Sequence, residues 1–516
     1  MEGTVVTCCS NSFAVGQQLI CFRWASGVCD RQAAGVWSRY VSFHSCLTVK
    51  MGRSYIVDVV VEKYLSSIGA SGAVCRTGLL IGQSSPQRDF VVLSTKTPQR
   101  GSESSGTLDD VDVDWVTEHA KQVSSMLPGG LSVLGVFLIV PPELSKEATN
   151  VLRKLVFAVE KYLTKERLWN DRDEDVSDRV ALQICSKTRK VICKTFDVKD
   201  PKTSAKPAEW KYQSGVSSTW PLVTCSVGIN LRLPVSDKSL EDTHRCVREG
   251  LQRWAKSISS GTCLINGKFM SPDTELMGGG GQKKNPKQGQ SKIQAQLLLP
   301  PEQCPPEQTT CAVSQPTASV LIRGQVSCRA YVHSNKPRAG QAAEAIKRDI
   351  LNTVSSRVDM LYDDLFMNQS EVGSGGPKKA VEKSHSLPLR VFAPVPESAF
   401  CVCDYMFPDE CVSAVAEHFQ EILDRSVAEE SIVTGLEVSR EDTRTNTPGQ
   451  HHTAGDRCQE DTEETLPTQL HHSGPPQPQD DVPKKQQGLQ YYVRLAVAGG
   501  VAMLAAAMSM LYLGEE

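Results

Sequence analysis

The segment Arg76–Gln83 reads RTGLLIGQ, Asp89–Pro98 reads DFVVLSTKTP, and Leu131–Pro142 reads LSVLGVFLIVPP. Each is a short apolar run bounded by charged residues, Gly or Pro, which is typical of buried β-strands. Between the second and third runs, Trp115–Met126 has apolar residues three and four positions apart, which predicts an amphipathic helix. This block therefore predicts two strands, a helix and a further strand in that order.

The rest of the chain repeats this mixture of patterns. Helical spacing of apolar residues recurs at Leu144–Leu163, Leu240–Ile258, Ala342–Phe366 and Asp409–Leu423. Further strands are predicted at Val180–Ser186, Val191–Phe196, Val223–Leu233, Val320–Val332, Arg390–Ala393 and Phe400–Tyr405. Interspersed strands and helices predict a fold of the α+β (mixed α/β) class.

Changes in composition divide the chain into segments. Residues 1–50 lack a sustained apolar run and are expected to be a poorly ordered extension without a secretory signal. We predict a first domain over residues 51–200 and a second α+β region over residues 201–430, interrupted by Gly- and Lys-rich loops at 278–290 and 373–384. Residues 431–490 are mostly polar and rich in Pro, so they are predicted to form a disordered tether.

Charge and cysteine usage exclude two classes of protein. The 516-residue chain has a formal net charge of -3, so composition gives no attraction for phosphate backbones and predicts no nucleic-acid partner. Its 18 cysteines are scattered without the spacing of a disulfide framework or a zinc motif. We expect reduced, mostly buried thiols.

The apolar segment Leu495–Leu513 (LAVAGGVAMLAAAMSMLYL) carries no charge. Nineteen helical residues are about 30 Å long, which matches the hydrocarbon thickness of a bilayer. The segment is therefore predicted to be a single membrane span within residues 491–513, and Gly499 and Gly500 could let another helix approach closely. Lys484 and Lys485 favour a cytosolic N-terminal side and a lumenal C-terminus, and the acidic residues after the span favour the endoplasmic reticulum.

Common catalytic motifs are absent from the sequence. It contains no GxSxG, P-loop, HExxH or strand-associated GxGxxG pattern. A Cys–His pair could in principle form from Cys401 or Cys403 and His418, but a chance pairing is more common among so many cysteines. His119 lies on an otherwise surface-type helix and is expected to be a solvated or capping residue.

The strand–strand–helix–strand block resembles the MPN fold, the scaffold of the JAMM metallopeptidases. That resemblance aligns Gly78 and the pair Leu134-Gly135 with the glycines of the family pattern. It implies that the zinc-ligand positions of active members fall on Cys75, Leu138, Val140 and Val151. A thiol and three aliphatic side chains cannot provide the imidazole and carboxylate ligands of a hydrolytic zinc site. The resemblance therefore implies a pseudoenzyme with no catalytic residues, no metal and no cofactor.

Longer motifs resemble the odorant-response-abnormal, fourth-member family (the odr-four homologues). They are TGLLIGQ at Thr77, TEHAKQVSSMLPGGLSVLGVF at Thr117, DPKTSAKPAEWKYQSGVSSTW at Asp200 and CRAYVHSNKP at Cys328. The resemblance implies a tail-anchored protein of the endoplasmic reticulum that assists the maturation or delivery of some G-protein-coupled receptors. It also implies a partner, the ubiquitin-fold-modifier-specific cysteine protease.

Three functions remain open from the sequence. An adaptor that recruits the protease fits the predicted tether, the span and the replaced ligand positions. A direct escort of receptors would not need the protease, and a peptidase with unusual ligands would need metal or thiol chemistry that the sequence does not display.

Overall fold

Two β-sheets organise the part of the chain that the computed structural model describes, which is residues 53–68, 75–99, 108, 111–172, 175–234, 240–276, 290–300, 319–333, 336–367 and 384–437. The first sheet has the strand order β7-β6-β5-β4-β2-β3-β1-β8 and mixes parallel and antiparallel pairs. Its strands are β1 (Ser54–Asp58), β2 (Arg76–Gln83), β3 (Arg88–Lys96), β4 (Ser132–Val140), β5 (Asp178–Cys185), β6 (Val191–Asp197), β7 (Lys206–Pro207) and β8 (Glu209–Gln213).

The first sheet closes into a barrel. Only Ala208 separates β7, which pairs with β6, from β8, which pairs with β1. The amide of Ala208 donates to Cys193 O at 3.1 Å, and the amide of Glu209 donates to Arg53 O at 2.9 Å. One extended segment, Lys206–Gln213, therefore joins the two sides of the sheet, and closure leaves no free edge over residues 206–208.

The barrel interior is a separate apolar core. It contains Tyr55, Leu80, Phe137 and Leu182 from four strands, and all four are fully buried. Helix α2 (Val59–Ile68) adds its apolar face to this core. Alternate residues of the same strands point outward, as the two-residue period of a strand requires.

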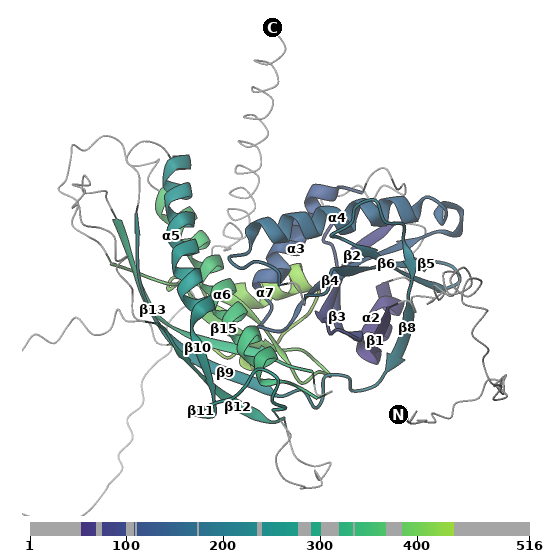
Figure 1. The fold of residues 1–516 in the computed structure, drawn as a ribbon. Helices are drawn as coiled ribbons and strands as arrows, with labels where there is room; N and C mark the ends of the chain where they lie inside the picture. The colour runs from purple at the N-terminus through teal and green to yellow at the C-terminus, as the bar shows by residue number, and fades with distance from the viewer. Residues whose placement is uncertain are drawn as a thin grey trace, which may run out of the picture. The chain divides into compact units, whose positions relative to one another are not determined.

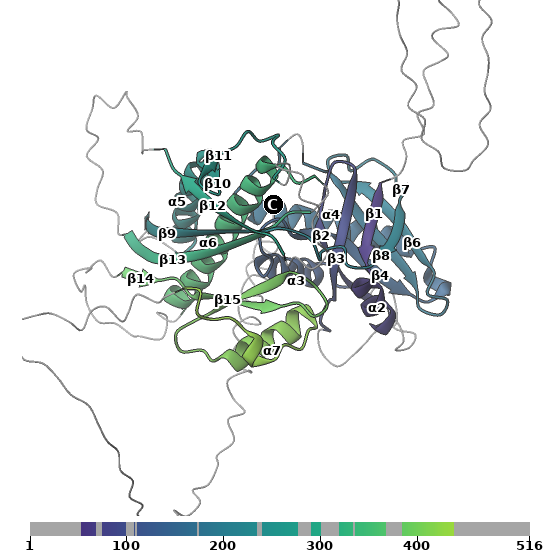
Figure 2. The ribbon, with the colours of Figure 1, turned by 90° about the horizontal axis from the view of Figure 1, so that it is seen from below.

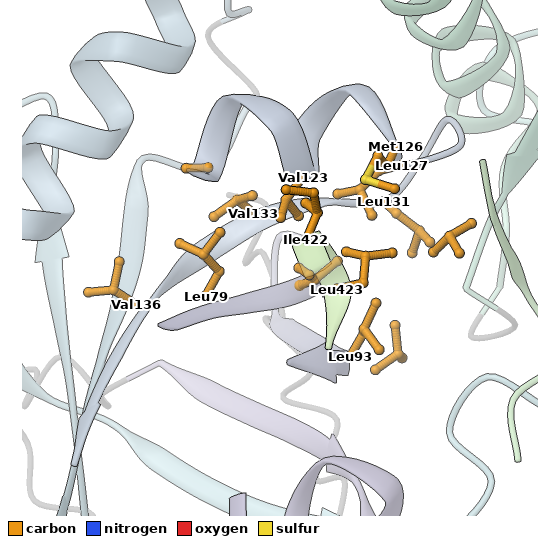
Figure 3. Close-up of a cluster of buried hydrophobic side chains, with 14 of the residues drawn as sticks. Leu79, Leu93, Val123, Met126, Leu127, Leu131, Val133, Val136, Ile422 and Leu423 are labelled. Carbon is orange, nitrogen blue, oxygen red and sulfur yellow. The ribbon is translucent and has the colours of Figure 1, made fainter. Parts of the chain in front are cut away.

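Helices cover the outward side of these strands. They are α3 (Val113–Ser125), α4 (Ala148–Glu166) and α7 (Val412–Leu423), with the 3-10 helices η2 (Pro142–Leu144) and η4 (Glu429–Ser431). Figure 3 shows Ile422 and Leu423 of α7 beside Leu79, Leu93 and Val123 of the barrel and α3. Helix α7 thus completes the core of the first sheet.

Close packing between strands requires two glycines, Gly78 on β2 and Gly135 on β4. A Cβ at Gly78 would lie 2.3 Å from Thr95 O, and a Cβ at Gly135 would lie 1.9 Å from Val180 O. Real Cβ atoms do not approach so closely, so the neighbouring strands could not keep their spacing with any other residue.

The second sheet has the order β11-β10-β12-β9-β13-β14. Its strands are β9 (Leu222–Pro234), β10 (Thr262–Ile265), β11 (Lys268–Phe269), β12 (Lys292–Leu298), β13 (Ser319–Tyr331) and β14 (Ser384–Ser386). The long strands β9 and β13 pair along their whole length, and α5 (Leu240–Ser260) and α6 (Ala339–Met367) pack on one face of the sheet (Figure 1). A two-stranded hairpin, β15 (Leu389–Pro394) and β16 (Cys401–Met406), precedes α7 (Figure 2).

The mixed α/β class predicted from the sequence is confirmed. Every strand and helix predicted from periodicity overlaps an element of that type. Sequence reasoning assigned no strand to β1, β7, β8, β10, β11, β12 or β14. Strands β7 and β8 belong to the first sheet although they lie after residue 200 in the sequence. Helix α7 packs into the core of the first sheet rather than that of the second sheet.

Candidate functional site

The predicted zinc-ligand positions lie together in an apolar cluster. Leu138 and Val140 are on β4 and are fully buried, while Cys75 immediately precedes β2. Because Arg76 pairs with Ile139, the antiparallel register carries Cys75 opposite Val140. Val151 lies on α4, and both it and Cys75 pack against the same cluster of buried side chains.

This donor set does not fit a hydrolytic metal. Three of the four positions are aliphatic and the fourth is a thiol, so the site has neither imidazole nor carboxylate ligands. Within the described residues, no group of three or more His, Cys, Asp or Glu side chains is placed to hold a metal ion. What these positions do instead is bury apolar surface between β4 and α4.

The expectation that His119 is solvated is wrong, whereas the alternative of a capping role agrees with its contact to a carbonyl in the last turn of α7. Its side chain is 3% exposed because α7 packs across α3, and its Nε2 lies 2.8 Å from Ile422 O. A carbonyl can only accept, so Nε2 carries the proton and Nδ1 is the bare nitrogen, which has no hydrogen-bond partner among the described residues. Burial lowers the pKa of His119 to about 4.

The cysteines and His418 do not form a catalytic pair. Cys403 and Asp404 are neighbours on β16 and so point to opposite faces. The Cys403 thiol accepts from the Arg390 guanidinium at 3.1 Å, whereas His418 Nδ1 lies 2.7 Å from Asp404 Oδ2. Burial raises the pKa of Cys403 to about 11, so the thiol stays protonated and is a poor nucleophile. Burial opposes the charge on His418, but Asp404 raises its pKa above the usual value.

Two buried ion pairs lie beside the C-terminal half of β13, beyond the residues that pair with β14. Asp349 of α6 and Arg390 of β15 form a bidentate pair with N–O distances of 2.7 and 2.9 Å, and both side chains are completely buried. The same carboxylate accepts from the amides of Arg329 and Gly129, each at 2.9 Å. Asp349 therefore joins α6, β13, the hairpin and the loop after α3.

The second pair is formed by Arg357 of α6 and Glu437. The N–O distances are 2.7 and 2.9 Å, and each side chain is 1% exposed. Glu437 also accepts from the amides of Ser327 at 2.7 Å and Arg390 at 3.0 Å. Four donors thus satisfy this carboxylate, which is what allows it to be buried.

Together these contacts form a joint between the second sheet, the hairpin and the barrel. The joint also includes Gln83 at the end of β2, whose Nε2 donates to Gly130 O and Tyr331 O and whose Oε1 accepts from the amide of His333 at 2.6 Å. Sequence reasoning missed all of these residues, since charged and amide side chains are usually solvated. One local signal could have indicated this joint: Arg390 is the single charged residue inside the apolar run LRVFAP.

The predicted anchor residues Leu495, Gly499, Gly500 and Leu513 lie outside the described residues. Among the helices that the structure does describe, none combines the length and the apolar character needed to cross a membrane.

Comparison with known proteins identifies the family. The family model described as ODR4-like, Odorant response abnormal 4-like, matches residues 78–434. The protein odr-4 homolog of Homo sapiens is 45% identical over 407 residues, which covers 76% of this chain and 86% of that protein. The homolog of Mus musculus is 40% identical over 479 residues, which covers 90% of this chain and 100% of that protein.

Among solved structures, the crystal structure of UfSP from C. elegans matches with a TM-score of 0.35 at 8% identity, covering 73% of this chain and 58% of that one. A TM-score of 0.35 is too low to establish a shared fold. The sequence matches suffice by themselves: this chain belongs to the ODR4-like family of odr-4 homologues.

Proposed function

We propose that this chain is a non-catalytic, tail-anchored adaptor of the endoplasmic reticulum. In this role its body faces the cytosol, recruits a ubiquitin-fold-modifier-specific cysteine protease to the membrane, and supports the maturation of a subset of G-protein-coupled receptors. The observation that carries the proposal is the apolar cluster of Cys75, Leu138, Val140 and Val151, the positions that the MPN resemblance aligns with the metal ligands of active peptidases. Family membership and the uncharged segment Leu495–Leu513 support it.

The joint gives the proposed adaptor a rigid body. Asp349, Arg357, Arg390 and Glu437 hold the second sheet, the hairpin and α6 in one arrangement. All four side chains are buried and paired with one another, which keeps their charges away from a substrate, so we assign them a positioning role rather than a catalytic one.

Cell fractionation tests recruitment. We expect the protease to move from the membrane fraction to the cytosol when this chain is removed, and to return when it is restored. A protease that stays equally membrane-bound without this chain would refute the adaptor proposal.

The replaced ligand positions need a separate test. Purified protein is washed with chelator and its metal content is measured. We expect no retained zinc, and stoichiometric zinc that survives the wash would show that the protein is a metalloprotein after all.

A direct receptor escort is the second candidate, because Gly499 and Gly500 would let a receptor helix approach the predicted span closely. Exchanging Leu495–Leu513 for an unrelated span distinguishes the two. Receptor delivery is expected to survive the exchange if the protein is an adaptor, and to fail if the span itself recognises receptors.

A further inference from the structure

The segment that closes the barrel is bonded to both of its sides at one point. The amide of Ala208 donates to Cys193 O on β6, whereas the amide of the next residue, Glu209, donates to Arg53 O on the side of β1. This alternation is the ordinary geometry of a strand, in which successive backbone groups point to opposite edges. The segment therefore has one edge towards β1 and one edge towards β6.

Beyond Glu209 the edge of β8 that faces away from β1 is unpaired. The backbone groups of Trp210 and Tyr212 point to this outer edge, as that of Ala208 does, because they lie two and four residues further along. The register of β6 with β7 would bring Val191 opposite Trp210, but among the described residues β8 pairs only with β1. Neither amide has a backbone acceptor there, so the outer edge of β8 offers two N–H donors and two C=O acceptors (Figure 1).

An aromatic rim borders this edge. Trp210 and Tyr212 pair directly with Tyr55 and Val57, which line the barrel interior, so both rings lie on the interior side. The Trp210 ring is 6.0 Å from Tyr55 and 6.3 Å from Tyr212 between centroids. Tyr212 is 37% exposed, and the buried Nε1 of Trp210 has no acceptor in hydrogen-bond geometry among the described residues. Apolar surface and an unused donor thus lie beside the unpaired backbone.

The chemistry of the edge defines what fits it. Alternating N–H and C=O groups at the spacing of a strand are matched by the main chain of another extended segment. Side chains of that segment on the interior side would cover the Trp210 and Tyr212 rings, and those on the other side would meet the Glu209–Lys211 ion pair, which is 2.7 Å long. The outer edge of β8 therefore fits an amphipathic strand.

Lys211 disfavours a second copy of this chain as the source of the strand. Antiparallel pairing of two copies through Trp210 and Tyr212 would place the two Lys211 side chains directly opposite each other, and like charges in that position destabilise a pair. Parallel pairing of two copies would be head-to-tail and would not close. A strand from a different protein, with an acidic or uncharged residue opposite Lys211, meets neither obstacle.

We infer that the outer edge of β8 docks an amphipathic strand of the recruited protein, which extends the barrel sheet by one strand. This inference rests on the proposed function, because it takes the recruited protein to be the ubiquitin-fold-modifier-specific cysteine protease. It adds the surface of contact and the conformation of the segment that binds there.

Residue-resolved hydrogen exchange tests the inference. The full chain in detergent is measured alone and with the purified protease. We expect the amides of Trp210 and Tyr212 to exchange rapidly in the free chain and to slow by about tenfold or more in the complex, because they gain acceptors. The amides of Glu209 and Lys211, which face β1, are the internal control and should exchange slowly in both samples.

A pair of variants gives the second measurement. Tyr212→Pro removes the ring and the outward N–H, whereas the matched control Tyr212→Ala removes the ring alone. Proline is tolerated at an edge where the N–H does not join the ladder, so β8 should stay paired with β1 in both variants. We expect the dissociation constant for the protease to be about 5- to 150-fold higher for Tyr212→Pro than for Tyr212→Ala, since a carbonyl of the docked strand loses its donor.

The outcomes separate this inference from the proposed function. A protease that does not bind the purified chain would overturn direct recruitment and the docking together. A protease that binds while the amides of Trp210 and Tyr212 exchange as fast as before would overturn the docking and leave recruitment intact. Slow exchange of these amides in the free chain would also overturn the docking, because the edge would already be occupied by this chain itself.

Discussion

Glu437 shows how much of this fold depends on single buried charges. Its carboxylate satisfies the guanidinium of Arg357 and two backbone amides while being 1% exposed. Removing one partner of such a pair leaves the other charge buried without compensation, which typically costs about 3–5 kcal/mol. We therefore expect Glu437→Gln to lower the free energy of unfolding by about that amount in urea denaturation.

A surface pair provides the control for Glu437. Glu143 and Lys187 are 2.8 Å apart but both are mostly exposed, so solvent screens their attraction. Glu143→Gln should leave the denaturation midpoint unchanged. If the two variants had equal effects, the joint would contribute nothing that an ordinary surface pair does not.

His119 makes stability depend on pH. Its pKa is about 4 in the folded protein, because burial disfavours the charged ring, and about 6.5 in an unfolded chain. Above pH 6.5 the ring is neutral in both states and has no effect. As pH falls from 6.5 to 4 the unfolded state binds the proton first, so the folded state loses stability, by about 3 kcal/mol in total. His418 does not offset this loss. Its pKa is raised in the folded protein, so its stabilising contribution is already fully present below pH 6.5 and does not grow as the pH falls further.

The measurement for His119 is denaturation of the wild type and His119→Gln across this pH range. We expect the variant to start from lower stability at pH 7 and to have a shallower decline towards pH 4. A parallel decline in the two proteins would mean that His119 titrates normally and that other groups cause the acid sensitivity.

At the scale of elements, the closing segment Lys206–Gln213 carries a testable role. Ala208→Pro removes the amide that donates to Cys193 O at the seam of the barrel and leaves that carbonyl unsatisfied. We expect a loss of about 1–3 kcal/mol in unfolding free energy and faster hydrogen exchange in β1 and β6. Ala208→Ser keeps the amide and is the control, and equal exchange in the two variants would show that the seam does not hold the barrel closed.

The elements also show what the sequence could predict. The strands β2, β3 and β4 each contain a continuous apolar run, so their pattern alone identified them. The strand β8 reads EWKYQ and is mostly exposed, and only its long-range pairing with β1 makes it a strand. The apolar cluster at Cys75 and Leu138 was predictable because a family pattern assigns those positions. The joint was not, since the partners of Arg390 and Glu437 come from distant segments and no local spacing connects them.

At the scale of the whole molecule, the proposed adaptor depends on which side of the membrane holds the body. Lys484 and Lys485 before the apolar segment favour a cytosolic N-terminal side, because positive flanks are retained in the cytosol. A glycosylation acceptor added after Glu516 should therefore be modified in microsomes. The sequon that begins at Asn368, which lies outside the described residues, should stay unmodified although lumenal Asn-x-Ser sites are acceptors.

Reversing the flanking charge with Lys484→Glu, Lys485→Glu should reduce modification of the added acceptor, whereas Lys190→Glu on the barrel should not. Glycans at Asn368 with none at the added site would place the body in the lumen, where a cytosolic protease could not reach it.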